Sequence, residues 1–260
     1  MTLQESSDHD QRVARERVSH SASDVLGVSR NLKRIFCHTE RTPARARLER
    51  DILQSLGRVE GNRVLDLGCG LGENTLDLAR RGALAVGIDL SLQYLCQARA
   101  DRDKQTDRAT FGVMDAHQLA FRDQAFDCIL GRGVLHHLNA ETGLQEVQRV
   151  LRPGGRAVFV EPLAANPLLR LLRILTPRAR TADERPLGRV DLLRMERSWN
   201  LQCSYYGLIT APVAAATSIF LRPFPNTSLV VWADRLERSL NRIALLRPLN
   251  QYVLLSLTRH

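Results

Sequence analysis

The segment Val64–Gly72, with the sequence VLDLGCGLG, decides the fold of this 260-residue chain. Its first four residues predict a short buried strand, and the glycines that follow, Gly68, Gly70 and Gly72, predict a turn that opens a helix. Glycines in such a turn permit positive φ angles and let a ligand come close to the backbone. A glycine triplet also occurs in purely structural turns, so the surrounding pattern has to decide its meaning.

Apolar strands alternate with helices from this segment onward. A continuous apolar strand that is followed by a helix is typical of a parallel sheet covered on both faces. We therefore expect an α/β fold with a doubly wound sheet. The expected strands are 63–67, 83–89, 110–114, 125–130 and 156–161, and the expected helices are 44–57, 73–81, 91–102 and 140–151.

The chain departs from this alternation after Pro162. Pro223 and Pro225 act as breakers, so we expect residues 210–227 to be irregular. The other elements expected in this part are helices at 166–175, 189–198 and 229–246, strands at 200–209 and 251–258, and a loop at 176–188.

Two aspartates follow neighbouring strands and are expected on the same rim of the sheet. Asp89 ends the second strand, 19 residues after Gly70, where a carboxylate can accept both hydroxyls of a ribose. Asp115 follows the third strand and can take an adenine amino group. Either aspartate alone also fits a helix cap or a solvated loop. The glycine spacing is G-x-G-x-G rather than the G-x-G-x-x-G of dinucleotide-binding folds, which disfavours a dehydrogenase.

Five motifs, in this order and spacing, resemble those of the class I S-adenosylmethionine-dependent methyltransferases. The resemblance covers roughly residues 45–161 and implies a Rossmann-like seven-stranded sheet of order 3-2-1-4-5-7-6, with strand 7 antiparallel and helical lid insertions. It divides the chain into an N-terminal lid segment (1–57), a cofactor-binding core (58–161) and acceptor-covering insertions with the closing strands 6 and 7 (162–260). The motifs are VLDLGCGLG (64–72), GIDLS (87–91), MDAHQLAF (114–121), FDCILGRGVLHHL (126–138) and VLRPGGRAVFVEP (150–162).

The resemblance also implies that S-adenosylmethionine is the cofactor and which residues bind it. Asp89 would bind the ribose hydroxyls, with Leu90 against the adenine, and Phe36 and His38 would belong to a segment that folds over the cofactor. The remaining implied contacts are Gly68, Cys69, Gly70 and Gly72 along the methionine part and ribose, Asp115 and Ala116 at the adenine, and Gly131 on the methionine carboxylate side.

Three further residues are candidates for catalysis. His136 and His137 follow the fourth strand, and Glu161 ends the fifth strand on the same rim. A histidine beside a carboxylate could deprotonate an acceptor, with Glu161 holding the imidazolium. In the family pattern the second histidine more often points at the acceptor, so we favour His137 as the base. The alternatives are that one histidine only packs or caps, and that Glu161 only caps a loop.

The net charge of +9 lies mostly in the last third of the chain. Residues 162–260 have 14 arginines against 6 acidic residues, a net charge of +8, whereas residues 61–161 have a net charge of −1. Arginines interleave with leucines from 168 to 178, which fits either a solvated face or a pocket roof that is apolar inside and basic at its mouth. Such a roof suits a lipid-like acceptor with an acidic group, and a peripheral membrane contact is a weaker version of the same idea.

The same composition disfavours nucleic acid as a partner and a metal as a cofactor. Aromatic residues make up 5% of the chain and none lies in the basic run 170–189, whereas nucleic-acid grooves interleave them with arginines. The five cysteines form no C-x-x-C pair, so we expect reduced thiols and no metal site. No stretch resembles a signal peptide or is long enough to span a bilayer, so we expect a cytoplasmic protein.

These patterns favour an enzyme that methylates an oxygen or nitrogen atom of a small or lipid-like metabolite, as in secondary-metabolite pathways. Two alternatives stay open. One is an RNA or protein methyltransferase that uses the basic C-terminal face, and the other is a non-catalytic module that binds S-adenosylmethionine. The sequence identifies neither the acceptor nor the oligomeric state.

Overall fold

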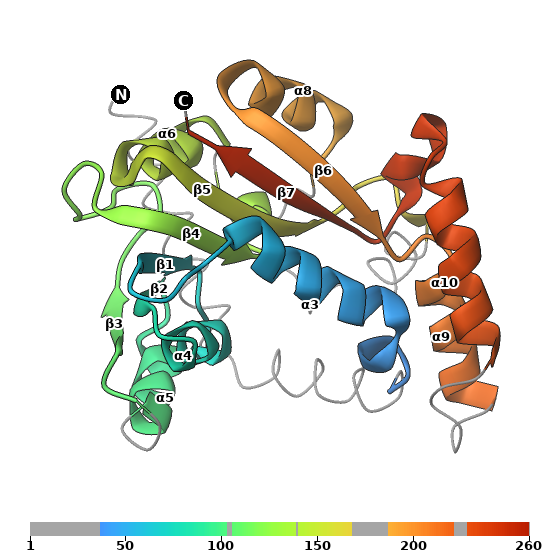
Figure 1. The fold of residues 1–260 in the computed structure, drawn as a ribbon, viewed down its shortest axis with the longest axis horizontal. Helices are drawn as coiled ribbons and strands as arrows, with labels where there is room; N and C mark the ends of the chain where they lie inside the picture. Colours follow the sequence, from blue (N-terminus) through green and yellow to red (C-terminus); the bar gives the residue numbers. More distant parts are fainter. Residues whose placement is uncertain (1–36, 103–105, 139, 168–186, 221–227, 260) are drawn as a thin grey trace.

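The computed structural model describes residues 37–102, 106–138, 140–167, 187–220 and 228–259 (Figure 1). The described residues form one seven-stranded sheet of order β3-β2-β1-β4-β5-β7-β6. The strand β7 runs antiparallel to both β5 and β6, and the other neighbouring strands are parallel. This topology confirms the expected fold. The strands are β1 (Arg63–Leu67), β2 (Leu84–Asp89), β3 (Ala109–Val113), β4 (Phe126–Arg132), β5 (Leu151–Pro162), β6 (Asn200–Tyr206) and β7 (Tyr252–Thr258).

Helices cover both faces of the sheet. On one face, α3, α4 and α5 pack against alternate strand residues such as Val64. On the other, α6 and α8 pack against the intervening residues such as Leu65. The helices are α3 (Pro43–Leu56), α4 (Glu73–Arg80), α5 (Leu92–Arg102), α6 (Ala140–Val150), α8 (Arg189–Ser198), α9 (Thr210–Phe220) and α10 (Ser228–Leu240), with 3-10 turns η1 (Thr39–Arg41), η2 (Leu135–His137) and η4 (Ala244–Leu249).

Local signals explain where several helices begin and end. Thr42 caps α3 by accepting a hydrogen bond from the Arg45 amide (3.0 Å), and Gly57 closes the helix with a φ of 75°. Ser91 precedes α5 and accepts a hydrogen bond from the Tyr94 amide at 3.3 Å, as expected of an N-cap. The sheet and these helices bring the carboxyl ends of β1 to β5 to one rim.

The expectation that residues 210–227 are irregular was wrong for the residues that the structure describes. Residues Thr210–Phe220 form the helix α9, whose sequence TAPVAAATSIF is rich in alanine. Pro212 lies in the first turn, where the missing amide removes no intrahelical bond. Pro223 and Pro225 follow the helix, outside the described residues.

Most of the expected boundaries differ from the observed ones by one or two residues, and a few differ by more. The strand expected over 156–161 begins five residues earlier, because β5 spans Leu151–Pro162. The helix expected to reach Leu151 ends at Val150, because Leu151 is the first residue of β5 and pairs with Phe126 of β4. The helix expected over 229–246 ends at Leu240, and the strand expected over 200–209 ends at Tyr206. Residues 168–175 of the expected helix and most of the loop at 176–188 lie outside the described residues, as does Phe36.

Candidate active site

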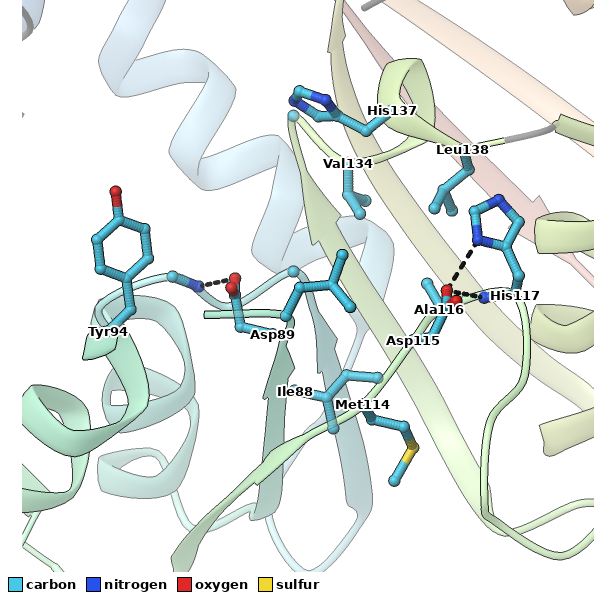
Figure 2. Close-up of a pocket in the computed structure, with 14 residues that line it drawn as sticks. Ile88, Asp89, Tyr94, Met114, Asp115, Ala116, His117, Val134, His137 and Leu138 are labelled. Atoms are coloured by element: carbon cyan, nitrogen blue, oxygen red, sulfur yellow. Dashed lines mark hydrogen bonds and ion pairs between the residues drawn. The ribbon is translucent and has the colours of Figure 1, made fainter. Parts of the chain in front are cut away.

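A cavity opens at the carboxyl ends of β1, β2 and β3, beside the turn that follows β4 (Figure 2). This is the rim where ligands bind in open parallel sheets. Most of the predicted site residues meet there. The lining residues are Gly68, Gly70, Ile88, Asp89, Leu90, Tyr94, Met114, Asp115, Ala116, His117, Gly133, Val134, His137 and Leu138.

The glycine loop forms one wall of the cavity. Gly68 and Gly70 have φ angles of 69° and 52°, in the left-handed region that favours glycine. A Cβ atom added at Gly70 would meet no atom within 4 Å, so this part of the loop faces open space. Gly72 has a φ of 79° and is the residue immediately before α4. It packs against Ala98 and Phe111 instead of lining the cavity.

The carboxylate of Asp89 is fixed beside this loop. Its Oδ2 accepts a hydrogen bond from the Gly70 amide at 2.9 Å, drawn as the dashed line at Asp89 in Figure 2. Its Oδ1 accepts a hydrogen bond from the Ser91 amide at 2.8 Å. Each carboxylate oxygen can accept a further hydrogen bond. The carboxylate can therefore receive two hydroxyl groups without giving up its backbone contacts.

A second carboxylate lies across the cavity. Asp115 Oδ1 accepts a hydrogen bond from the His117 amide at 2.9 Å and lies 2.8 Å from His117 Nδ1 (Figure 2). Ala116 and Leu90 contribute small apolar surfaces to the same cavity. This wall can accept hydrogen bonds from a polar ring while covering its face with apolar atoms.

The turn after β4 supplies a histidine to the cavity. His137 lines it, whereas His136 is buried behind it, with the two ring centroids 4.2 Å apart. Glu161 is fully buried and accepts hydrogen bonds from the amides of Val134 (3.0 Å) and Leu135 (2.9 Å) through Oε1. Its Oε2 lies 2.7 Å from His136 Nδ1. The carboxylate therefore pairs with His136 rather than His137 and holds the turn that presents His137.

Comparisons with known proteins agree with this geometry. Residues 65–159 match a family model described as a methyltransferase domain. The chain is 34% identical to the O-methyltransferase cnsE of Penicillium expansum over 125 residues, which make up 46% of this chain and 45% of that protein. It is 38% identical to the demethylmenaquinone methyltransferase of Tropheryma whipplei (strain Twist) over 117 residues, 45% of this chain and 48% of that protein. The matches thus span about half the length of these curated relatives.

A solved structure shares the fold over most of the chain. The geranyl diphosphate C-methyltransferase from Streptomyces coelicolor A3(2), solved with S-adenosylhomocysteine, superposes with a TM-score of 0.60. The superposition covers 83% of this chain and 79% of that one at 18% sequence identity. Residues 65–159 are therefore a methyltransferase domain, in a sheet with the strand order that the resemblance to the class I S-adenosylmethionine-dependent enzymes implied.

Two residues predicted to bind the cofactor lie beneath the cavity of the methyltransferase domain. Cys69 is buried, and burial raises the pKa of its thiol well above the usual range, which makes it a packing residue rather than a nucleophile. A Cβ atom added at Gly131 would lie 2.6 Å from the Phe159 ring, so this glycine allows two strands to pack. Gly133, two residues later, lines the cavity in its place.

Sequence reasoning missed several residues that line the cavity. Tyr94 projects from α5, and burial, followed by the charge of Asp89, raises the pKa of its hydroxyl. The hydroxyl therefore stays protonated at neutral pH and can donate a hydrogen bond. A signal existed for the others, because they lie inside quoted motifs: Ile88, Met114, His117, Gly133, Val134 and Leu138.

Proposed function

We propose that this chain transfers the methyl group of S-adenosylmethionine to an oxygen or nitrogen atom of a small or lipid-like metabolite. The observation that carries the proposal is a single cavity in which the glycine loop, two carboxylates and a histidine meet. The division into a lid segment (1–57), a core (58–161) and acceptor-covering elements (162–260) is part of the proposal, as is a cytoplasmic location.

The proposed cofactor contacts follow from the hydrogen-bonding capacity of the cavity. Asp89 would accept the two ribose hydroxyls through its remaining lone pairs, since both oxygens already have fixed backbone donors. Asp115 would accept the adenine amino group, with Leu90 and Ala116 against the ring. Gly68 and Gly70 would allow the methionine part to pass close to the backbone.

When bound, S-adenosylmethionine supplies an activated methyl group on a sulfonium. The chain then has to align the acceptor and exclude water, and alignment contributes most to such a reaction. His137, which lines the cavity, would remove a proton from a hydroxyl or amine acceptor. Glu161 and His136 would act as positioning residues, because their hydrogen bonds hold the turn that carries His137.

The acceptor class is supported by what the relatives are named for. They include an O-methyltransferase and demethylmenaquinone methyltransferases, and a fold relative is named for geranyl diphosphate. Small or lipid-like acceptors recur in these names. Both oxygen and carbon occur among the methylated atoms, so the atom has to be determined by experiment.

The proposal is tested by incubating the full chain with methyl-labelled S-adenosylmethionine and an extract of the source cell. We expect label in an organic-soluble small molecule, identified by mass spectrometry. Label recovered only in the RNA or protein fraction would contradict the proposed acceptor class. Binding of S-adenosylmethionine without any transfer would favour a non-catalytic module.

His137→Ala separates the role of the base from cofactor binding. We expect its turnover on a hydroxyl or amine acceptor to fall about 10²–10⁴-fold, while calorimetry shows unchanged affinity for S-adenosylmethionine. Full turnover in this variant would refute the role of His137 as a base.

A further inference from the structure

We propose that the outer end of the α9–α10 pair is a docking surface for an anionic lipid bilayer. The two helices stand side by side at one end of the molecule (Figure 1). Neither helix contributes a residue to the cavity described above, so the proposal does not depend on methyl transfer.

A group of large apolar side chains is exposed at this end. Phe220 is 80% exposed and Trp232 is 59% exposed, and Ile219 and Leu229 are exposed by more than half. Single exposed apolar residues are ordinary on a protein surface, but a group of them marks a contact surface. The four residues are defined here as the apolar tip.

Helix geometry places three residues of the apolar tip near one level at the end of the pair, with Trp232 about one helical turn behind them. Glu237 of α10 bonds to Thr210 at the start of α9, which aligns these two positions. With a rise of about 1.5 Å per residue, Phe220 lies roughly 15 Å along α9 from that level and Leu229 roughly 12 Å along α10. The tip therefore gathers the end of one helix and the beginning of the other.

The charges of α10 are sorted between its two faces. Its acidic residues, Asp234 and Glu237, are buried and paired with Arg47 of α3. Its exposed charged residues are Arg235 and Arg238, and Arg242 is exposed just beyond the helix. Arg238 also lies 3.4 Å from Asp234. The outward face of α10 is therefore cationic behind an apolar tip.

This order of side chains matches the layers of an anionic membrane surface. The three arginines lie about 5–15 Å behind Trp232 along the helix axis, a depth comparable to the lipid headgroup region. Interfacial helices insert apolar and tryptophan side chains by about 5–10 Å and place arginines among the headgroups. No helix in the described ranges is long and apolar enough to cross a bilayer, so the proposed contact is peripheral.

Trp232 can report the contact directly. The chain contains two tryptophans, and the other, Trp199, is 4% exposed. We would titrate the full chain with vesicles of phosphatidylcholine alone and of phosphatidylcholine with about one third phosphatidylglycerol. We expect a blue shift of the emission and protection from acrylamide only with the anionic vesicles, both reversed by high salt.

Two paired variants test the two parts of the surface by vesicle co-sedimentation. Phe220→Ser with Trp232→Ser removes the apolar tip, and Arg235→Glu with Arg242→Glu reverses charge behind it. Each arginine contributes about fivefold to binding at a charged surface, so we expect the second pair to weaken binding by more than tenfold. Leu92→Ser and Arg122→Glu, at exposed positions elsewhere, are the matched controls and should bind like the unmodified chain.

The proposal is overturned if the anionic vesicles cause no blue shift, or if both paired variants, with unchanged unfolding midpoints, bind vesicles as well as the unmodified chain. It is also overturned if sedimentation shows self-association in the absence of lipid that Phe220→Ser with Trp232→Ser abolishes, because the tip would then contact a second copy.

Discussion

Glu161 shows how one buried side chain organises the site. Its two oxygens receive the Val134 and Leu135 amides and contact His136 Nδ1 without any exposure to solvent. Glu161→Ala would leave these donors buried and unsatisfied, so we expect the free energy of unfolding to fall by about 3 kcal/mol. Urea denaturation measures this, with the exposed Glu60→Ala as a control expected to change it by less than about 0.5 kcal/mol. Equal effects of the two variants would contradict the buried role.

Asp66 predicts a dependence of stability on pH. Burial raises the pKa of this carboxyl to about 6, although Thr75 donates a 2.6 Å hydrogen bond to it. Between pH 4 and 6 the unfolded chain has lost this proton while the folded chain keeps it, so stability falls as pH rises through this range. We expect the unmodified chain to lose up to about 3 kcal/mol relative to Asp66→Asn between pH 4 and 7. A stability difference that does not change with pH would contradict the assigned pKa.

For single residues, the sequence predicted which of them lie on the rim but not which side chains they contact. Strand ends and motif spacing predicted that Gly70, Asp89 and Asp115 would share a cavity, and they do. Which of two adjacent histidines contacts Glu161 depends on the direction of a 3-10 turn, which no spacing rule specifies. Likewise, the cavity takes Gly133 rather than Gly131, because Phe159 of the neighbouring strand covers Gly131.

Among the elements, β1 to β4 were predicted to within two residues because each is an apolar run bounded by turn residues, whereas β5 begins at Leu151, before the Pro153–Gly155 turn signal that was expected to precede it. α9 was missed because its most evident stabilising contact is remote in sequence. Glu237 of α10 accepts hydrogen bonds from the amides of Gly207, Ile209 and Thr210 and from the Thr210 hydroxyl. A carboxylate at a helix N-terminus satisfies free amides and favours the helix dipole. Nothing in residues 210–220 alone reveals a cap that comes from another helix.

The contact between Glu237 and the start of α9 can be tested by removing the carboxylate. Glu237→Ala should expose the first amides of α9 and leave Arg47 with one acidic partner fewer. We expect at least about tenfold faster hydrogen exchange in α9 than in the unmodified chain, with α4 unchanged. Glu196→Ala, at an exposed position on α8, is the control. Unchanged exchange in α9 of the Glu237→Ala protein would contradict its role as a cap.

For the whole molecule, the net charge differs strongly between two regions of the chain. The region that carries the cavity has a net charge of −1, and the last third has +8. The arginines between residues 168 and 186 fit either a solvated face or a basic mouth over the acceptor, but they lie outside the described residues. The described part of the excess includes Arg235, Arg238 and Arg242, and their place behind the apolar tip favours a surface contact.

The central claim is that the cavity binds S-adenosylmethionine with Asp89 on the ribose. Titration calorimetry tests it most directly, with S-adenosylmethionine and NAD injected separately into the unmodified chain, Asp89→Asn and the control Asp77→Asn on the exposed face of α4. Hydrogen bonds to a charged carboxylate contribute about 1.5–3 kcal/mol each, so we expect at least about tenfold weaker binding in Asp89→Asn. The control should bind S-adenosylmethionine like the unmodified chain, and NAD should give no heat. No heat from S-adenosylmethionine with the unmodified chain, or equal affinity in Asp89→Asn, would contradict the account.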